Sequence, residues 1–287
     1  MNILAIDAGG TSIKAAPFYG EKIGEVSVRP SHAAEGGPRF IEEICRVIEE
    51  YPFCERVALS VTGQVDPSDG SITYANSNVP GFTGTPLRQL LQARCGRPVT
   101  VENDVNAAAL GEAAFGAGRG YENFFCLTYG TGVGGALILN GGLYRGSHGC
   151  AGQIGRLLTH PGEADGFYEA RASAAALVRK ANALHPAVTD GKTFFKFLRE
   201  GDENLSRLLD LWIDEVVLGL VSFIYMLDPA CLVLGGGLLQ EPGLADRIQK
   251  RCISALMPGG RTIVLKAAEL GNLAGLYGAY LLAVKEG

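Results

Sequence analysis

The chain has 287 residues, of which 47% are hydrophobic and 19% are charged, a mixture typical of a protein with a sizeable core. Its net charge of -5 and pI near 5.5, with no local Lys/Arg cluster, argue against a surface for nucleic acid or anionic membranes. Asp7 interrupts the apolar start, so we expect no signal peptide, and the longest apolar run, residues 216–227, is about half of a membrane span. These features predict a cytoplasmic protein with a small neutral or phosphorylated ligand.

The seven cysteines stand singly, without the paired spacings of a zinc site or the density of a secreted disulfide framework. We therefore expect reduced thiols. His148, Cys150 and His160 come nearest to a metal cluster, but a structural zinc site needs four ligands and no second pair stands nearby. The sequence therefore predicts no zinc site.

The first half of the chain alternates between strand and helix patterns. We expect three short strands within residues 2–29, a helix over 35–51, a strand over 56–61, a helix over 85–95 and a strand over 98–102. Thr85 is the expected N-cap of the second helix, because Pro86 would then occupy its first position.

The second half repeats this plan. We expect strands within residues 124–145, helices around 168–184 and 203–227, a strand over 230–234 and a helix after Pro242. A last helix over 271–285 carries small residues on one face, Gly275, Gly278 and Ala279, and is expected to pack within or between lobes. The repetition predicts an α/β fold of two lobes with a cleft between them.

A glycine turn follows the first apolar strand. Asp7 leads into Gly9, Gly10 and Thr11, and the segment closes with Lys14. Glycines let backbone amides approach an anion, and an acidic residue can hold a cation or its water, so the turn suits a nucleotide phosphate bound with a metal. An ordinary hairpin turn is the alternative.

A second glycine turn, residues 130–135, also lies between two apolar runs. Its letters fit G-x-G-x-x-G, but a dinucleotide-binding fingerprint needs a helix after the glycines, and a strand follows here. Gly191-Lys192-Thr193 lacks the earlier glycine of a P-loop, since Pro186 stands there. Residues 235–237 are three glycines that suit an adenine or ribose, or simply a strand-to-helix loop.

Asp104 follows a strand and opens a helix, where a carboxylate is stabilised as the anion. This position indicates a general base for phosphoryl transfer, because such a reaction benefits from a carboxylate that accepts the attacking hydroxyl's proton. Helix capping is the competing structural role.

Five segments together resemble the sugar kinases of the ROK group (repressor, open reading frame, kinase) within the actin-like ATPase superfamily, and the resemblance spans the whole chain. They are residues 7–14 (DAGGTSIK), 102–112 (ENDVNAAALGE), 130–135 (GTGVGG), 151–155 (AGQIG) and 235–237 (GGG). The resemblance implies a two-lobed actin-like ATPase (ribonuclease H-like) fold with an interlobe cleft. It also implies ATP-dependent phosphorylation of a hexose, usually at the 6-hydroxyl.

The resemblance further implies roles for individual residues. Asp104 is the implied general base, and Asp7 lies near the Mg²⁺ that accompanies ATP. The implied sugar-binding residues are Gly63, Asn78, Asn103, Asp104, Gln153, Arg156 and Glu169. The implied nucleotide-binding residues are Asp7, Gly9, Gly10, Thr11, Lys14, Thr131, Gly132, Gly235 and Gly236.

Two departures from the family pattern concern the sugar side. Most ROK kinases read Glu-Ile-Gly-His after the Ala-Gly pair and then carry a three-cysteine zinc loop, whereas this chain reads Gln153-Ile154-Gly155-Arg156 and has no cysteine in residues 157–169. The chain thus resembles a zinc-free branch. Arg156 is longer than histidine and a pure donor, and Gln153 adds a donor where the family has an acceptor, so sugar specificity stays open.

We expect an N-terminal lobe of residues 1–107, completed by the helix at 272–287, with the sugar side and the first phosphate turn. A C-terminal lobe of residues 108–271 should carry the second phosphate turn and the adenosine site. The expected protein is a cytoplasmic, homodimeric ATP:hexose kinase of the glucose or N-acetylmannosamine class that uses ATP and Mg²⁺.

The alternatives are a β-glucoside or disaccharide kinase, a non-catalytic sugar-binding sensor, and a chaperone-like ATPase without a sugar. A DNA-binding repressor is not expected, because the first phosphate strand begins at Asn2 and leaves no room for a helix-turn-helix.

Overall fold

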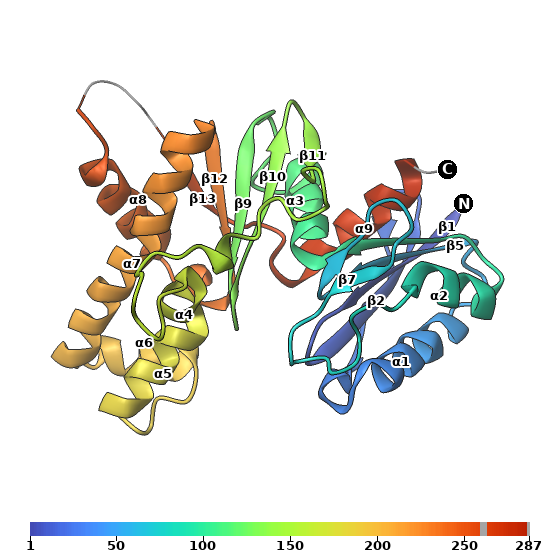
Figure 1. Cartoon of the computed structure of the whole chain (residues 1–287), viewed down its shortest axis with the longest axis horizontal. Coiled ribbons are helices and arrows are strands. Elements are labelled where there is room, and N and C mark those ends of the chain that lie inside the picture. The colour runs from blue at the N-terminus through green and yellow to red at the C-terminus, as the bar shows by residue number, and fades with distance from the viewer. Residues whose placement is uncertain (259–262, 286–287) are drawn as a thin grey trace. The chain divides into compact units, whose positions relative to one another are not determined.

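A computed structural model describes residues 1–258 and 263–285, which form two compact units (Figure 1). Unit 1 comprises Met1–Arg119, Leu143–Ala151 and Asn272–Gly287, and unit 2 comprises Gly120–Gly142 and Gly152–Gly271. Unit 1 thus includes the whole third helix and the short segment 143–151, whereas the expected lobe boundary fell after residue 107.

The sheet of unit 1 combines antiparallel and parallel strands. Its strands are β1 (Asn2–Ala8), β2 (Ser12–Tyr19), β3 (Lys22–Ile23), β4 (Ser27–Pro30), β5 (Arg56–Val61) and β8 (Val99–Asn103). Their order is β3-β2-β1-β5-β8, and β4 also pairs with β2. β1 runs antiparallel to β2 but parallel to β5, and β5 runs parallel to β8. A separate ribbon pairs β6 (Gln64–Val65) with β7 (Ile72–Tyr74).

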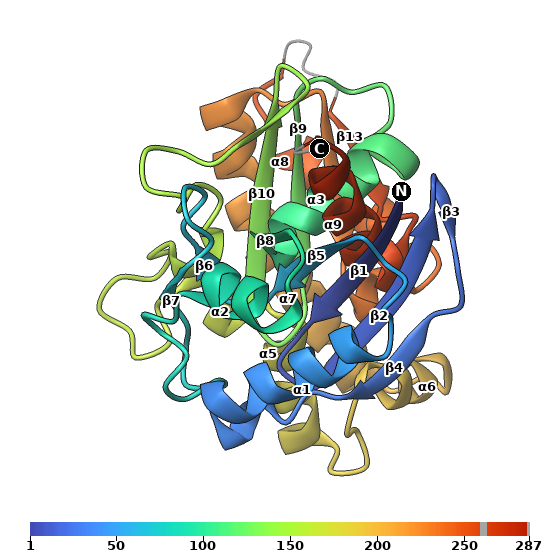
Figure 2. The same ribbon diagram turned by 90° about the vertical axis from the view of Figure 1, so that its right-hand side faces the viewer.

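Helices cover both faces of this sheet (Figures 1 and 2). They are η1 (Ala33–Glu35), α1 (Gly37–Glu49), α2 (Leu87–Cys95), α3 (Asp104–Phe115), η4 (Gly271–Leu273) and α9 (Ala274–Lys285). Side chains alternate along β1, so Leu4 and Ile6 share one core cluster with α1 and α2, while Ile3 and Ala5 share another with α9. The N-terminal apolar run is therefore buried on both faces, as a central strand requires.

The start of α2 corrects one expectation. The N-cap position belongs to Pro86, and no side chain among the described residues caps the helix, so Thr85 is not the N-cap. Pro86 has a non-helical ψ of 66°, which delays the helix by one residue to Leu87. At the other end, Gly96 terminates the helix in the left-handed region at φ 66°, as its glycine suggests.

The second sheet, whose residues belong to unit 2 except for Leu143 and Tyr144 of β11, has the same succession of strands. They are β9 (Phe124–Tyr129), β10 (Val133–Leu139), β11 (Gly142–Tyr144), β12 (Cys231–Gly235) and β13 (Val264–Ala267), in the order β11-β10-β9-β12-β13. β9 is antiparallel to β10 and parallel to β12, which is parallel to β13. Each sheet therefore places its glycine turn between its first two strands.

The helices of unit 2 are η2 (Ile154–Arg156), α4 (Tyr168–Ala172), α5 (Ala174–Leu184), α6 (Gly191–Arg199), α7 (Glu203–Leu227), η3 (Gly237–Gln240) and α8 (Leu244–Ala255). The helix expected around 168–184 is divided at Ser173, whose hydroxyl accepts from Ala176 N at 3.1 Å and caps α5. Within residues 1–258 and 263–285, no helix combines the length and apolarity needed to cross a membrane.

Helices α3 and α9 pack closely through glycines. A Cβ at Gly278 would lie 1.7 Å from the carbonyl oxygen of Ala107, and one at Gly111 would lie 2.5 Å from that of Ala274. Both obstacles are backbone atoms, which cannot yield as the end of a flexible side chain can. The small face of the last helix is therefore a packing surface within unit 1.

We predict that Gly278→Ala lowers the free energy of unfolding by about 1–2 kcal/mol. Overpacking of about 1–3 kcal/mol or more outweighs the roughly 1 kcal/mol that alanine gains in helix propensity. Denaturant unfolding measures the change. Gly237→Ala is the control, since its Cβ would meet nothing within 4 Å. Equal stability of the two variants would contradict the close packing.

Candidate active site

The parallel register of unit 1 gathers polar residues at one edge of the sheet. Asp7 is aligned with Ser60, and Ser60 is aligned with Glu102. The Ser60 hydroxyl donates to Asp7 Oδ1 at 2.9 Å, and Lys14 Nζ lies 3.1 Å from Asp7 Oδ2. Gly275 of α9 leaves space for this carboxylate, because a Cβ there would lie 2.7 Å from Oδ1. Asp7 and Lys14, both expected at the nucleotide phosphates, are therefore in contact.

The first glycine turn is closed by a hydrogen bond from Gly9 N to Ser12 O at 3.0 Å. Thr11 is exposed, and a Cβ on Gly10 would meet nothing within 4 Å, so the outer side of the turn is open. This geometry suits an approaching anion, although contact of Gly9, Gly10 and Thr11 with a nucleotide stays a prediction.

Asn103, and not Asp104, is the N-cap of α3. Its Oδ1 accepts from Val105 N at 3.0 Å and from Asn106 N at 3.1 Å, while its Nδ2 donates to Gly63 O and Asp104 Oδ1, each at 2.9 Å. Because Asn103 satisfies the helix amides, the capping role does not need Asp104. The Asp104 carboxylate occupies the first turn, with a further bond from Val105 N to its Oδ1 at 2.9 Å.

The protonation of Asp104 is unusual. Its desolvation within the site, together with the nearby negative charge of Asp7, raises the pKa of this half-buried carboxyl to about 7. The hydrogen bonds from Val105 N and Asn103 Nδ2 act in the opposite direction and are outweighed. A carboxyl with this pKa can take up and release a proton near neutral pH, as a general base must.

Gly63 and Asn78 differ in how they relate to this centre. The Gly63 carbonyl oxygen accepts a hydrogen bond from Asn103 Nδ2, which also donates to Asp104 Oδ1. Gly63 therefore lies close to Asp104. Asn78 lies in an exposed turn, where its backbone N–H donates to Asn76 Oδ1 at 3.0 Å. No contact that the structure records within its described residues joins Asn78 to Asp104, and its expected sugar contact stays a prediction.

In unit 2, Glu169 lies against the second glycine turn. A Cβ at Gly132 would lie 2.7 Å from Glu169 Oε2, and one at Gly155 would lie 2.9 Å from it. Glycines at both positions therefore make room for this carboxylate. Thr131 is exposed at the tip of the turn, where Gly130 N bonds to Gly132 O at 3.0 Å.

Arg156 lies on the same side of unit 2. Its guanidinium carbon is 4.4 Å from the ring centroid of Phe167, and its Nη1 is 3.5 Å from Glu169 Oε1. The side chain is 63% exposed, so it can meet a ligand from solvent. Arg156 and Glu169, both expected at the sugar, are therefore brought together, whereas Gln153 is exposed beside them in sequence.

A buried tyrosine pair, which the sequence reasoning missed, supports this region. Tyr129 precedes the glycine turn and Tyr168 precedes Glu169, and their hydroxyls lie 2.9 Å apart. Tyr168 also donates to Val216 O at 2.8 Å. Burial raises the pKa of both phenols, so they stay protonated and join the turn to Glu169. Their positions next to two expected site residues were the available signal.

The triple glycine after β12 approaches the end of β9. Gly235 is aligned with Thr128, and a Cβ at Gly236 would lie 2.1 Å from Tyr129 O. Gly236 also has a φ of 120°, which a side chain would strain. The glycine at 236 is thus required by backbone packing, and contact of Gly235 and Gly236 with adenosine stays a prediction.

Residues 157–169 take the place of the zinc loop expected in most ROK kinases, and ion pairs of Arg171 hold this segment together. Arg171 is bound to Glu163, to Asp165 at 2.9 Å and to Glu215 at 3.4 Å, and Leu158 forms a bridge with Phe167. In the parts of the chain that the structure describes, no group of three or more His, Cys, Asp or Glu could hold a metal. At Asp7 the oxygen donors of the carboxylate and Ser60 are of the kind that magnesium prefers.

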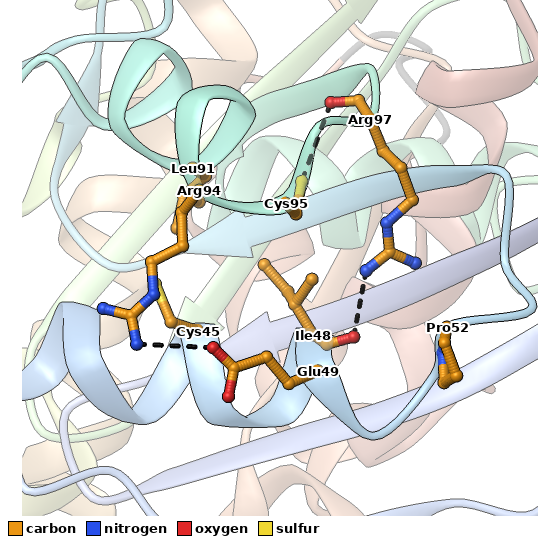
Figure 3. A pocket seen from close by; sticks show the side chains of 8 residues that line it. All are labelled: Cys45, Ile48, Glu49, Pro52, Leu91, Arg94, Cys95 and Arg97. Carbon is orange, nitrogen blue, oxygen red and sulfur yellow. Dashed lines mark hydrogen bonds and ion pairs between the residues drawn. The ribbon is translucent and has the colours of Figure 1, made fainter.

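A cavity of about 260 Å³ lies elsewhere in unit 1, between α1 and α2 (Figure 3). Its charged groups are already paired. Arg97 donates to the carbonyls of Ile48, Tyr51 and Cys54, and Arg94 contacts Glu49 at 3.3 Å. None of the expected site residues lines this cavity, and we assign it no part in the site.

Two sheets of the same strand succession, each with a glycine turn after its first strand, define the class of actin-like ATPase folds. The chain belongs to the ROK family, whose family model matches residues 3–286. It is similar to the β-glucoside kinase of Listeria innocua, with 30% identity over 97% of this chain and 96% of the relative.

Solved structures agree with this assignment. A ROK hexokinase from Thermus thermophilus is 35% identical with a TM-score of 0.84. A ROK family glucokinase from Streptomyces griseus, in complex with glucose and AMPPNP, is 29% identical with a TM-score of 0.87. Both similarities cover 100% of this chain and of the other. The family and fold class expected from the sequence are confirmed.

We predict that Asp104→Asn stabilises the protein at pH 8 and that the gain disappears toward pH 4. A raised pKa means that ionisation of Asp104 favours unfolding, increasingly from its ordinary pKa of 3.8 up to about 7. The gain can reach about 4 kcal/mol, since a tenfold change in proton affinity is worth about 1.4 kcal/mol. Denaturant unfolding across this pH range measures it.

Asp66→Asn is the control with the opposite sign. Ser68 donates hydrogen bonds to this exposed carboxylate and lowers its pKa, so its ionisation favours the folded state. We expect the control to lose stability above pH 4. A loss for Asp104→Asn at pH 8 would contradict the raised pKa.

Proposed function

We propose that this protein is an ATP-dependent sugar kinase that phosphorylates a hexose or N-acetylhexosamine, with Asp104 as general base. The observation that carries the proposal is the carboxyl of Asp104 at the start of α3, held by hydrogen bonds from Asn103 Nδ2 and Val105 N, with its pKa raised by burial and by the charge of Asp7. The similar glucokinase from Streptomyces griseus, whose structure is in complex with glucose and AMPPNP, supports a hexose and a nucleotide as the two ligands.

The proposed reaction begins with the sugar hydroxyl donating a hydrogen bond to Asp104. The carboxylate accepts the proton as the hydroxyl oxygen forms its bond to the γ-phosphorus and the bond from phosphorus to the ADP oxygen breaks. Asn103 fixes the base by donating to Asp104 Oδ1. Lys14, now paired with Asp7, can turn to a phosphate oxygen. When bound with ATP, magnesium neutralises phosphate charge, and Asp7 is the residue that would hold it or its water.

The 6-hydroxyl and the glucose or N-acetylmannosamine class follow from the family resemblance. A β-glucoside is the second candidate, favoured by the β-glucoside kinase of Listeria innocua and by the lack of a three-cysteine loop in residues 157–169, which would leave room for a group beyond the sugar's 1-position. We further propose a cytoplasmic homodimer with no nucleic-acid or membrane partner. Size-exclusion chromatography with light scattering tests the dimer.

We predict sugar-dependent ADP release with ATP and magnesium for at least one of glucose, N-acetylmannosamine, N-acetylglucosamine, mannose, fructose, allose and cellobiose. Asp104→Asn should lower kcat by at least about 100-fold, the usual contribution of general base catalysis. Since the base must be ionised, kcat/KM should fall as the pH decreases below about 7. Silence with all sugars, despite ATP binding, would instead favour a sensor, and a sugar-independent rate would favour a simple ATPase.

We predict that Arg156→Gln raises the KM for the sugar by about threefold to tenfold and leaves the KM for ATP unchanged. The change removes the charged donor of the proposed sugar contact, together with the cation–π contact with Phe167 and the weak ion pair with Glu169 that hold it, each worth about 0.5–1 kcal/mol. Arg207→Gln is the control, because that side chain is 77% exposed and pairs with Glu203 on α7. An unchanged sugar KM would remove Arg156 from the sugar site.

A further inference from the structure

The segment Leu143–Ala151 belongs to unit 1, although the chain on either side of it belongs to unit 2. A hydrogen bond from Ala151 N to Arg145 O at 3.1 Å closes the segment on itself. A Cβ at Gly149 would lie 3.1 Å from Val65 O, so the segment also packs against β6. None of its residues was expected in the active site, yet it reaches the strand that carries Asn103.

That reach is made by Arg145. Its Nε and Nη2 both donate to Glu102 Oε2, at 2.9 and 2.7 Å. The Glu102 side chain is 6% exposed and that of Arg145 is 32% exposed, so the carboxylate is buried and the arginine comes to it from the surface. A buried carboxylate requires such a partner, because without it the lost hydration is not replaced.

The other oxygen of Glu102 holds the start of α3. Oε1 accepts from Asn103 N and from Asn106 Nδ2, each at 2.9 Å. Asn103 in turn caps the helix and donates to Asp104 Oδ1. An unbroken series of hydrogen bonds therefore runs from the Arg145 guanidinium through Glu102 and Asn103 to the carboxylate proposed as the base.

We propose that Arg145 is a positioning residue for phosphoryl transfer: by pairing with Glu102 it fixes the first turn of α3 and thereby the place of Asp104. This inference rests on the proposed function. In the proposed reaction, Arg145 touches neither the sugar nor the nucleotide phosphates. The loss of Arg145 leaves Glu102 charged and unpaired, so Glu102 must seek water or other donors and draws Asn103 and Asn106 with it.

Neutralising Arg145 and neutralising Glu102 should have different consequences. When Glu102 is neutral in Glu102→Gln, the amide oxygen still accepts from Asn103 and Asn106, and the partly exposed Arg145 can be hydrated. When Arg145 is neutral, a buried charge stays behind. Arg145→Gln should therefore be the more harmful single change, and Glu102→Gln should suppress it.

The test compares steady-state kinetics and unfolding of Arg145→Gln, Arg145→Lys, Glu102→Gln and the double variant Arg145→Gln/Glu102→Gln. Arg145→Gln should lower kcat by about 10- to 100-fold, because a small misplacement of a catalytic group costs up to about 100-fold. The KM for ATP should stay within about twofold. Arg145→Lys should recover part of the loss, and the double variant should recover most of it.

Arg29→Gln is a matched control. Arg29 also makes a two-point pair within unit 1, at 2.8 and 2.5 Å from Glu50, and its side chain is 27% exposed, but the Glu50 side chain is 50% exposed, so this control leaves no buried charge behind. This pair joins β4 to the end of α1, and the contacts recorded for the described residues do not connect it to α3. We expect a change in stability from this variant without a change in kcat.

The possible results separate the inference from the proposed function. An unchanged kcat in Arg145→Gln, or a loss that Glu102→Gln does not suppress, would overturn the positioning role. If the wild-type protein shows no sugar-dependent ADP release, the proposed function fails and the role in catalysis fails with it. The unfolding data for the four variants would then still show whether Arg145 and Glu102 are energetically coupled. Additive effects of the two substitutions on stability would show that Arg145 does not act through Glu102.

Discussion

The parallel pairing of β1, β5 and β8 is the constraint on which the candidate site depends. Parallel strands bring their carboxyl ends to one edge of the sheet, and this register aligns Asp7, Ser60 and Glu102 there. Ala8, Val61 and Asn103 form the next row, where the strands give way to loops and to α3. Residues about 50 and 95 positions apart thus become neighbours through backbone hydrogen bonds alone, and a one-residue slip would turn their side chains to the opposite face.

The same constraint acts in unit 2, which repeats the strand succession of unit 1. β9 takes the place of β1 and β12 that of β5, so Thr128 and Gly235 meet at the corresponding edge. Each unit presents a glycine turn beside that edge. The last helix does not stay with the unit that precedes it in sequence. α9 follows β13 of unit 2 but packs with α3 in unit 1, where small residues allow backbone contact. Unit 1 is therefore completed by the last helix of the chain.

Local patterns predicted most of this architecture, and the reason is visible in particular residues. Ile3 to Ile6 form a continuous apolar run because both faces of β1 are covered, and the glycines at 9 and 10 mark its turn. Asp104 could be placed at a helix start from sequence because strand and helix patterns meet there. Local patterns fail where the partner is distant or where one residue shifts a boundary. The sequence pattern predicts Thr85 as an N-cap, but the non-helical ψ of Pro86 moves the N-cap position to Pro86 itself.

Arg145 and Tyr168 could not be found by local patterns for the same reason. Arg145 is 43 residues from Glu102, and Tyr168 is 39 residues from Tyr129. Neither spacing forms a motif, since only the folded backbone creates the contact. The closing of the loop around Arg171 is similar, because its partner Glu215 lies on another helix. Such residues support the expected site residues rather than replace them.

Glu102 and Asp104 show how one short segment separates support from reactivity. Both are acidic and lie two residues apart, but Glu102 is buried with an arginine and two further donors. Asp104 is half-buried with hydrogen bonds, and no cation from the described part of the chain pairs with it. The Asp7 carboxylate, which could attract a cation, is itself paired with Lys14 and adds repulsion. A fully paired Asp104 would hold its charge firmly and accept a proton poorly. The buried charge of Asp104 is only partly offset by its hydrogen bonds, which destabilises the fold but keeps the pKa of this carboxyl near neutral. The donors around Glu102 offset its charge and hold that carboxyl in place.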